Sequence, residues 1–240
     1  MTTTVLSIIA TETLEVTATL RALLAADGIF VAPTDTVYGL FSRYDSPAAL
    51  ARIYAAKDRP PQKAIPVLIG DPAQLDALVP MPLHPLASAL MARFWPGPLT
   101  LVLPALPHLP AELTAGAPTV AVRLPAHAAL GALLTAVGPL AATSANRSGQ
   151  SETHSVAQVL EQLDGRVDLI LGDVMPGDDA PGNEEAAPAR FAAPNLASTI
   201  VDLSDPAAPA RILREGPLGA AIREFLAAAD GSSTPHADRD

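Results

Sequence analysis

Short apolar runs alternate with longer mixed stretches along the chain, and both end at proline, glycine or small polar residues. Apolar runs of four to eight residues bounded by turn residues are typical of buried strands. Stretches with apolar residues three or four positions apart are typical of helices with one buried face. The repeated alternation of the two patterns predicts an α/β fold, in which helices cover a sheet.

The predicted elements follow from this pattern. Strands are expected at 29–32, 64–69, 99–103, 119–124, 140–143, 167–171, 198–203 and 212–214. Helices are expected at 15–26, 46–59, 71–79, 85–94, 127–136, 155–163 and 217–228. Ser46-Pro47 and Asp71-Pro72 have the form of an N-cap followed by proline in the first helical turn. Gly28 is predicted as the C-cap of the first helix.

The length of 240 residues and the apolar content of 49% indicate a globular chain with a sizeable core. We expect one catalytic domain over residues 1–229, with an acidic, proline-rich loop at 176–197 and a disordered tail at 230–240. No apolar run approaches the roughly 18–20 residues that span a bilayer, and no signal peptide is evident. We therefore expect a cytoplasmic protein without a membrane segment. The absence of cysteine excludes disulfides and thiolate chemistry.

The net charge of −10 argues against tight non-specific binding of nucleic acid. It leaves room for a local positive site. The two lysines, Lys57 and Lys63, lie in one short segment together with Arg59. Basic residues at a helix end can simply complement the helix dipole. They can also form an anion site, and both interpretations stay open here.

Small polar side chains follow two of the predicted strands. Pro33 ends the 29–32 strand because it has no N–H to donate, and Thr34, Asp35 and Thr36 come directly after it. The segment 144–149 follows the 140–143 strand in the same way. Ligands of open α/β sheets bind at such strand ends. The alternative is that these side chains only cap their own backbone.

Arg123 is unusual near the end of an apolar strand, where an unpaired charge is costly. Either it reaches solvent or it meets an anion. Trp95, in a proline-rich turn, is expected to be a packed anchor. Familiar phosphate-loop, dinucleotide, metalloprotease and serine-hydrolase motifs are absent from the sequence. The five histidines are scattered, so metal ligation by them is not expected.

What remains is a set of hydroxyls, amides and cations at predicted strand and helix ends. It comprises Thr34, Thr36, Lys57, Arg59, Lys63, Arg123, Ser144, Asn146, Ser198 and Arg214. Without a nucleophile–base pair, such a set suits phosphate binding and electrostatic stabilisation of phosphoryl or nucleotidyl transfer.

Six ordered motifs between residues 12 and 216 resemble those of the YrdC-like family, most closely its bacterial threonylcarbamoyl-AMP synthases. They are Pro33–Leu40, Lys57-Asp58-Arg59-Pro60, Pro96–Thr100, Thr119–Pro125, Ser144-Ala145-Asn146 and Ser198–Leu203. The resemblance implies a single-domain, twisted, open mixed sheet, flanked by helices around a large concave cavity.

The family's reaction joins L-threonine, bicarbonate or CO2, and ATP, with Mg2+ carried by the ATP phosphates, into threonylcarbamoyl-AMP and pyrophosphate. The resemblance further implies a downstream complex that transfers the threonylcarbamoyl group to tRNA, with tRNA binding by this chain weak at most. Lys57 and Arg59 would be catalytic. ATP would contact Lys57, Arg59, Lys63, Thr119, Ser144, Arg214 and Asn146, the last either on the nucleotide or supporting its loop. Threonine would contact Thr34, Thr36, Tyr38, Arg123, Ala142 and Ser198.

Two positions depart from the family pattern. Lys63 stands where many relatives have asparagine, and Leu68 where many have a histidine that contacts threonine. Two other functions stay open on the same resemblance. One is an RNA-binding or ribosome-maturation module without synthase activity, and the other is a carbamoyl-adenylate-forming domain like that of hydrogenase maturation.

Overall fold

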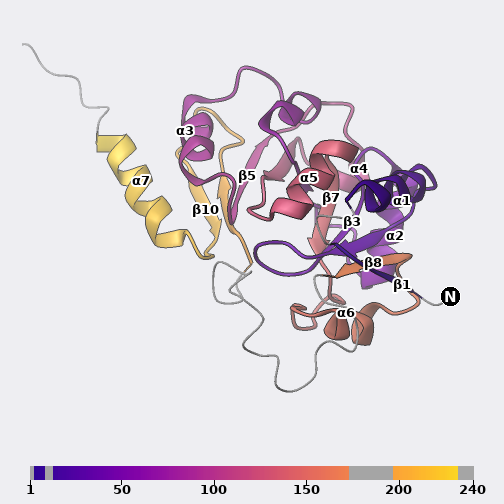
Figure 1. Cartoon of the computed structure of the whole chain (residues 1–240). Coiled ribbons are helices and arrows are strands. Elements are labelled where there is room, and N and C mark those ends of the chain that lie inside the picture. The colour runs from indigo at the N-terminus through magenta and orange to yellow at the C-terminus, as the bar shows by residue number, and fades with distance from the viewer. Residues whose placement is uncertain (1–2, 9–12, 173–196, 232–240) are drawn as a thin grey trace, which may run out of the picture.

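The computed structural model describes residues 3–8, 13–172 and 197–231 (Figure 1). Within these ranges the strands form one ten-stranded sheet of order β1-β8-β2-β3-β7-β4-β6-β5-β9-β10. The predicted α/β class and the single mixed sheet flanked by helices are therefore confirmed. Nearly all of the predicted 176–197 loop, and the predicted tail beyond residue 231, lie outside the described residues.

The strands are short and both parallel and antiparallel. They are β1 (Thr4–Ser7), β2 (Phe30–Ala32), β3 (Gly39–Arg43), β4 (Val67–Leu68), β5 (Leu99–Pro104), β6 (Thr119–Arg123), β7 (Leu140–Ser144), β8 (Leu169–Gly172), β9 (Thr199–Asp202) and β10 (Arg211–Arg214). The pairs β1–β8, β2–β8, β4–β6 and β5–β9 are parallel, and the other neighbours are antiparallel.

The helices largely match the expectations. They are α1 (Thr13–Ala25), α2 (Pro47–Lys57), the 3-10 helix η2 (Pro72–Ala77), α3 (Pro85–Phe94), α4 (Ala111–Thr114), α5 (Ala128–Val137), α6 (Val156–Leu163) and α7 (Gly219–Gly231). The 71–79 segment winds as a 3-10 helix, and the single turn α4 was not predicted. In the described part of the chain, no helix combines the length and apolar character needed to cross a membrane.

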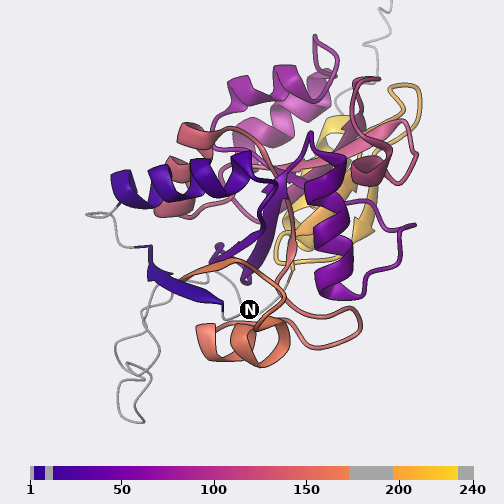
Figure 2. The same ribbon diagram turned by 90° about the vertical axis from the view of Figure 1, so that its right-hand side faces the viewer.

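Two apolar clusters lie on opposite faces of the sheet. Phe41 and its stacking partner Phe30 pack with α1 and α5, whereas Leu40 packs with α2 and α3. Leu40 and Phe41 are neighbours in β3, and successive side chains of a strand point to opposite faces. Figure 2 shows α1 and α2 on the two sides of these strands.

The predicted caps of α2 and η2 are confirmed. The Ser46 hydroxyl accepts a hydrogen bond from Ala49 N at 3.2 Å, and Asp71 accepts one from Ala73 N at 2.7 Å. These side chains satisfy backbone donors that the first helical turn leaves without partners.

The prediction of Gly28 as the C-cap of α1 needs correction. Asp27 takes the left-handed conformation, with φ of 54°, and Gly28 follows it. Gly28 N donates to Leu23 O at 2.9 Å, which closes the end of the helix. A Cβ at Gly28 would lie 2.5 Å from Leu23 Cγ, so glycine is needed here for close approach and not for its φ.

Strands β1 and β3 were not predicted, and β4 is shorter than the expected 64–69 strand. The turn after β2 reverses the chain, so that Ala32 pairs with Gly39 and β3 runs antiparallel to β2. The polar residues Thr34–Thr36 occupy this turn. The missed strand β3 therefore explains why these side chains lie where two neighbouring interior strands end.

Candidate functional site

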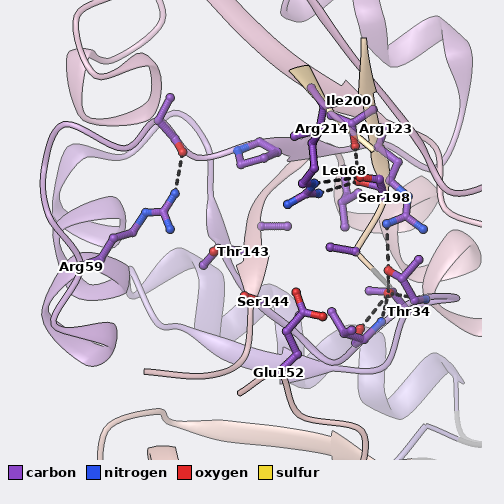
Figure 3. Close-up of a pocket in the computed structure, with 18 residues that line it drawn as sticks. Thr34, Arg59, Leu68, Arg123, Thr143, Ser144, Glu152, Ser198, Ile200 and Arg214 are labelled. Atoms are coloured by element: carbon purple, nitrogen blue, oxygen red, sulfur yellow. Dashed lines mark hydrogen bonds between the residues drawn. The ribbon is translucent and has the colours of Figure 1, made fainter. Parts of the chain in front are cut away.

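A cavity of about 280 Å³ lies against the sheet, and Figure 3 shows the residues that line it. Leu68 and Ala142 belong both to its wall and to the apolar cluster under α1 and α5, so the cavity lies beside those helices. Thr100, Ile200 and Arg214 occupy one row across β5, β9 and β10 and continue the wall. The site is thus formed by strands that are far apart in sequence.

The cavity brings together most of the predicted site residues. Those that line it are Thr34, Thr36, Arg59, Arg123, Ala142, Ser144, Ser198 and Arg214. Lys57, Lys63, Thr119, Tyr38 and Asn146 were also predicted but are not part of its lining. What each of these residues binds stays a prediction.

The turn after β2 is held by its own hydroxyls. Thr34 Oγ1 accepts from the backbone N of Thr36 and of Val37 and donates to Val37 O at 2.7 Å. The two threonine hydroxyls, Thr34 Oγ1 and Thr36 Oγ1, also lie 3.0 Å apart. Thr34 therefore caps its own backbone and lines the cavity at the same time.

Arg123 meets an anion within the protein. Its Nη2 donates to Asp35 Oδ1 at 2.5 Å, with the two side chains 7% and 1% exposed. Nη1 donates to Thr36 Oγ1 and Nε to Gly97 O, each at 3.0 Å. The alternative in which Arg123 reaches solvent is therefore wrong. Burial lowers the pKa of Arg123, and the Asp35 carboxylate opposes that shift.

Asp35 is a residue whose role the sequence analysis missed. It does not line the cavity and lies behind Arg123. Its second oxygen, Oδ2, is buried and accepts no hydrogen bond from the described residues. In sequence Asp35 is an ordinary turn residue, and only the fold shows that it supports a cation 88 positions away.

Beside Arg123, a second arginine closes the same end of the cavity. Arg214 donates from Nε to Ser198 O at 2.9 Å and from Nη2 to Ser198 Oγ at 3.1 Å. Ser198 Oγ in turn lies 2.8 Å from Thr100 Oγ1. Burial lowers the pKa of Arg214, and the nearby charge of Glu152 opposes that shift. These hydrogen bonds fix the positions of Ser198 and of the Arg214 guanidinium group.

Arg59 lies at the other end of the cavity, away from Arg123 (Figure 3). Its Nη2 donates to Ala64 O at 2.8 Å and its Nε to Lys63 O at 3.2 Å. Burial lowers the pKa of Arg59. The cavity therefore has cationic groups at two separate ends.

Lys57 does not line the cavity and instead contacts the backbone at the end of β7. It is only 2% exposed, and its ammonium donates to the carbonyl oxygens of Ser144 and Asn146. Burial, and secondarily the charge of Arg59, lowers the pKa of Lys57 to about 7, while Glu152 opposes the shift. The Lys57 side chain thus joins the end of α2 to the loop after β7.

Asn146 has contacts that fit loop support. Its amide donates to Arg147 O at 3.0 Å and to Gln150 O at 2.8 Å. The structure therefore favours, of the two roles that the sequence left open, the one in which Asn146 shapes the loop.

The other predicted residues outside the lining lie at different depths. Tyr38 is 3% exposed within the core. Thr119 shares a face of β6 with Arg123, but four strand positions, about 13 Å, separate the two. Lys63 is exposed, and its carbonyl oxygen accepts from Arg59 and Tyr54.

Three polar residues line the cavity without having been singled out, namely Thr100, Thr143 and Glu152. Thr100 and Thr143 lie within the predicted strands 99–103 and 140–143. Thr100 is a polar residue in an apolar strand, which is a signal that could have found it, whereas alternation places Thr143 on the face opposite to Ala142 and Ser144. Glu152 gives no such signal, because an acidic residue in a Ser/Thr-rich loop is ordinary.

The site is thus an open, cation-rich cavity, and the described residues of its lining contribute hydroxyls and a single carboxylate. In the described ranges no group of three or more His, Cys, Asp or Glu side chains could hold a metal ion. The fold and the site together define a mixed α/β protein with one cavity whose two ends each present cationic groups suited to an anion.

Residues 22–180 match the Sua5/YciO/YrdC family, described as "telomere recombination". Because the match covers well over half of the chain, the protein belongs to this family. The motif resemblance seen in the sequence is thereby confirmed.

Curated relatives include threonylcarbamoyl-AMP synthases. The protein of Bacillus subtilis is 43% identical over 152 residues, which are 62% of this chain and 44% of that protein. The protein of Alkalilimnicola ehrlichii is 41% identical over 157 residues, 65% of this chain and 80% of that protein. The chain thus spans less than half of the first relative and most of the second.

A solved structure described as P. abyssi Sua5 complexed with L-threonine superposes with a TM-score of 0.73 at 33% identity. It covers 88% of this chain and 56% of that one. The structure of E. coli YciO, at 23% identity and a TM-score of 0.67, shows the same fold.

Proposed function

We propose that this protein is an L-threonylcarbamoyladenylate synthase, which forms threonylcarbamoyl-AMP and pyrophosphate from L-threonine, CO2 or bicarbonate, and ATP. The names of its relatives and the threonine complex of P. abyssi Sua5 support this reaction. The observation that carries the proposal is the cavity with Arg59 at one end and Arg123 at the other. Such a cavity suits two substrates that each bring an anionic group.

The chemistry needs no nucleophile from the protein. The threonine amine reacts with CO2 to give a carbamate and releases protons. A carbamate oxygen then attacks the α-phosphorus of ATP, and the bond to the β-phosphate oxygen breaks to release pyrophosphate. The protein has to align two anions and stabilise the charge on the leaving group, which suits a site of arginines and hydroxyls.

The two ends of the cavity suggest where each substrate binds. Arg123, with Thr36 and Ser198, would hold the threonine carboxylate, because two of its five N–H groups have no acceptor among the described residues. Arg59 would face the pyrophosphate, as the resemblance implies. Thr34 and Ala142 would complete the threonine end. Ser144 and Arg214 would contact the nucleotide, as the resemblance implies, so the nucleotide would extend to the end of the cavity where Arg214 lies beside Arg123.

The predicted residues outside the lining receive a less direct role. We assign Lys57 and Asn146 to support of the loop that carries Ser144, on the strength of their contacts with its backbone. A direct contact of Lys57 with phosphate stays a prediction. So do contacts of Lys63 and Thr119 with ATP and of Tyr38 with threonine.

We propose that Mg2+ binds together with ATP. The described residues of the cavity lining include a single carboxylate, so phosphate oxygens would supply most of the ligands of the ion. When bound, the ion neutralises phosphate charge. The product would pass to a complex that modifies tRNA, and a reaction that uses ATP and serves tRNA belongs in the cytoplasm.

The deciding experiment measures pyrophosphate release with each component omitted in turn. We expect release only when threonine, bicarbonate, ATP and Mg2+ are all present. Serine should be used roughly ten- to two-hundredfold less efficiently, because it lacks the threonine methyl group. Release that does not depend on threonine would overturn the proposal.

The alternative RNA-binding module is tested beside it by titrating tRNA at two salt concentrations. A chain with a net charge of −10 should bind tRNA weakly at physiological salt. Submicromolar, steeply salt-dependent binding without pyrophosphate release would favour the alternative.

A further inference from the structure

Among the described residues that line the cavity, Glu152 is the only one with an acidic side chain. It is half-buried, and its backbone is fixed by the fully buried neighbour Thr153. Thr153 donates from its hydroxyl to Ala145 O at 3.1 Å, and its carbonyl oxygen accepts from Tyr38 N at 3.0 Å. The Glu152 side chain is thus held at the cavity and points into it (Figure 3).

The charge of Glu152 is not used by a protein partner. In the described part of the chain its carboxylate has neither a hydrogen bond nor an ion pair within 4.0 Å. The carboxylate still attracts Lys57 and Arg214 over a longer distance, since it raises the pKa of both against the effect of burial. Asp35, by contrast, does not line the cavity, and its Oδ1 is paired with Arg123. Glu152 is therefore a carboxylate that is available to a ligand.

A carboxylate without a protein partner favours a positively charged ligand group beside it over a negatively charged one. A phosphate group there would be repelled, whereas an ammonium group would be attracted. An α-amino acid carries both charges, and the cavity offers Arg123 for the carboxylate and Glu152 for the amino group. In Figure 3 the Glu152 carboxylate points toward the part of the cavity near Thr34, away from Arg59.

We propose that Glu152 binds the amino group of the amino-acid substrate. The proposal rests on the proposed function, because it names the group that recognises threonine in that reaction. It also orients the substrate, because the amino and carboxylate groups share one carbon and two charged contacts on that carbon leave it little freedom to turn. In the described ranges, no other acidic side chain lines the cavity and could supply the second contact.

The test compares two ligands by calorimetry in the absence of ATP and bicarbonate. L-Threonine has the amine, and 3-hydroxybutanoate keeps the carboxylate, hydroxyl and methyl groups but lacks it. We expect Glu152→Gln to weaken threonine binding about ten- to a hundredfold, the usual effect of losing a charged hydrogen bond. Binding of 3-hydroxybutanoate should stay the same or improve. Glu152→Asp, which keeps the charge, should recover part of the threonine affinity.

Glu161→Gln is the matched control, because Glu161 is exposed on α6 and outside the cavity lining. It should bind both ligands as the wild type does. An unchanged threonine affinity in Glu152→Gln, or an equal loss for both ligands, would overturn the proposal. So would a loss confined to ATP with Mg2+, which would make Glu152 a ligand of the metal.

Measurements on the wild-type protein distinguish a failure of this proposal from a failure of the proposed function. If the wild type releases pyrophosphate only with threonine and the Michaelis constant for threonine is unchanged in Glu152→Gln, the role of Glu152 alone is refuted. If the wild type neither binds threonine nor requires it, the proposed function fails and the assignment of Glu152 fails with it.

Discussion

At the scale of single residues, the site depends on how its cations are held. Arg123 has a buried carboxylate behind it, Arg214 has the backbone and hydroxyl of Ser198, and Arg59 has two carbonyl oxygens. A guanidinium group that is already fixed loses little freedom when it binds an anion. These contacts therefore pre-organise the site before a substrate arrives.

Replacing Arg59 tests the pyrophosphate end of the cavity. Arg59→Ala should lower turnover on the order of a hundredfold, as loss of one transition-state donor does. Stability should fall by no more than about 2 kcal/mol, because only two backbone contacts near the surface are lost. Steady-state pyrophosphate release and thermal melting measure the two effects. Arg93→Ala, on α3 and outside the cavity, is the control, and turnover within a few-fold of wild type in Arg59→Ala would refute the assignment.

Replacing Asp35 tests the support of Arg123. Asp35→Asn leaves a buried guanidinium without its counter-charge, so the free energy of unfolding should fall by about 3 kcal/mol. The Michaelis constant for threonine should rise while that for ATP changes little. Denaturant titration and steady-state kinetics measure these effects.

The exposed pair of Arg43 and Asp45 provides the control for Asp35. Asp45→Asn should change stability by less than about 1 kcal/mol, since both partners are more than 40% exposed. If Asp35→Asn is as stable as Asp45→Asn, the buried pair does not have the role given to it here.

At the scale of elements, the site depends on α2 and on the turns at strand ends. The Ser46 cap fixes where α2 begins, and the Lys57 ammonium fixes its last turn to the loop after β7. A buried ammonium at this junction makes the attachment of the two elements depend on pH.

The pKa of Lys57 is about 7 in the folded protein and ordinarily about 10.5. Below pH 7 the side chain is charged in both folded and unfolded states, so the cost of burying the charge is fully present. Between pH 7 and 10.5 the unfolded state binds more protons, and stability therefore rises with pH. Relative to Lys57→Met, the wild type should gain up to about 1.4 kcal/mol per pH unit in this range. Denaturant titrations at pH 7, 8 and 9 measure the gain, with exposed Lys63→Met as the control. A stability difference that does not change with pH would contradict the shifted pKa.

Most elements could be predicted because their signals are local. Ser46-Pro47 identifies a helix start and Leu99–Leu103 a strand without reference to any other part of the chain. The order of the strands and the partner of Arg123 could not be predicted, because they depend on contacts between residues far apart in sequence. For the same reason the sequence showed that Arg123 needs an anion but not that Asp35 is that anion. The sequence places Lys57 and Arg59 in one motif, whereas in the structure only Arg59 of the two lines the cavity.

At the scale of the whole molecule, positive charge is concentrated in a cavity of a protein whose net charge is −10. The net negative charge of the chain repels polyanions such as RNA at long range. Small anions can still reach the cavity, because their net charge is low and short-range contacts with arginine dominate once they enter. The charge distribution therefore favours a small-molecule site over an extended nucleic-acid surface.

The order of the strands also limits how the chain can be shortened. β8 and β9 are consecutive in the chain, yet seven strand spacings, about 34 Å, separate them across the sheet. A fully extended chain covers at most about 3.6 Å per residue, so at least about ten residues are needed to bridge them. Removing residues 177–194 therefore requires a replacement of several residues. A shorter tether would pull Ser198 and Arg214 away from the cavity even though neither residue had been changed.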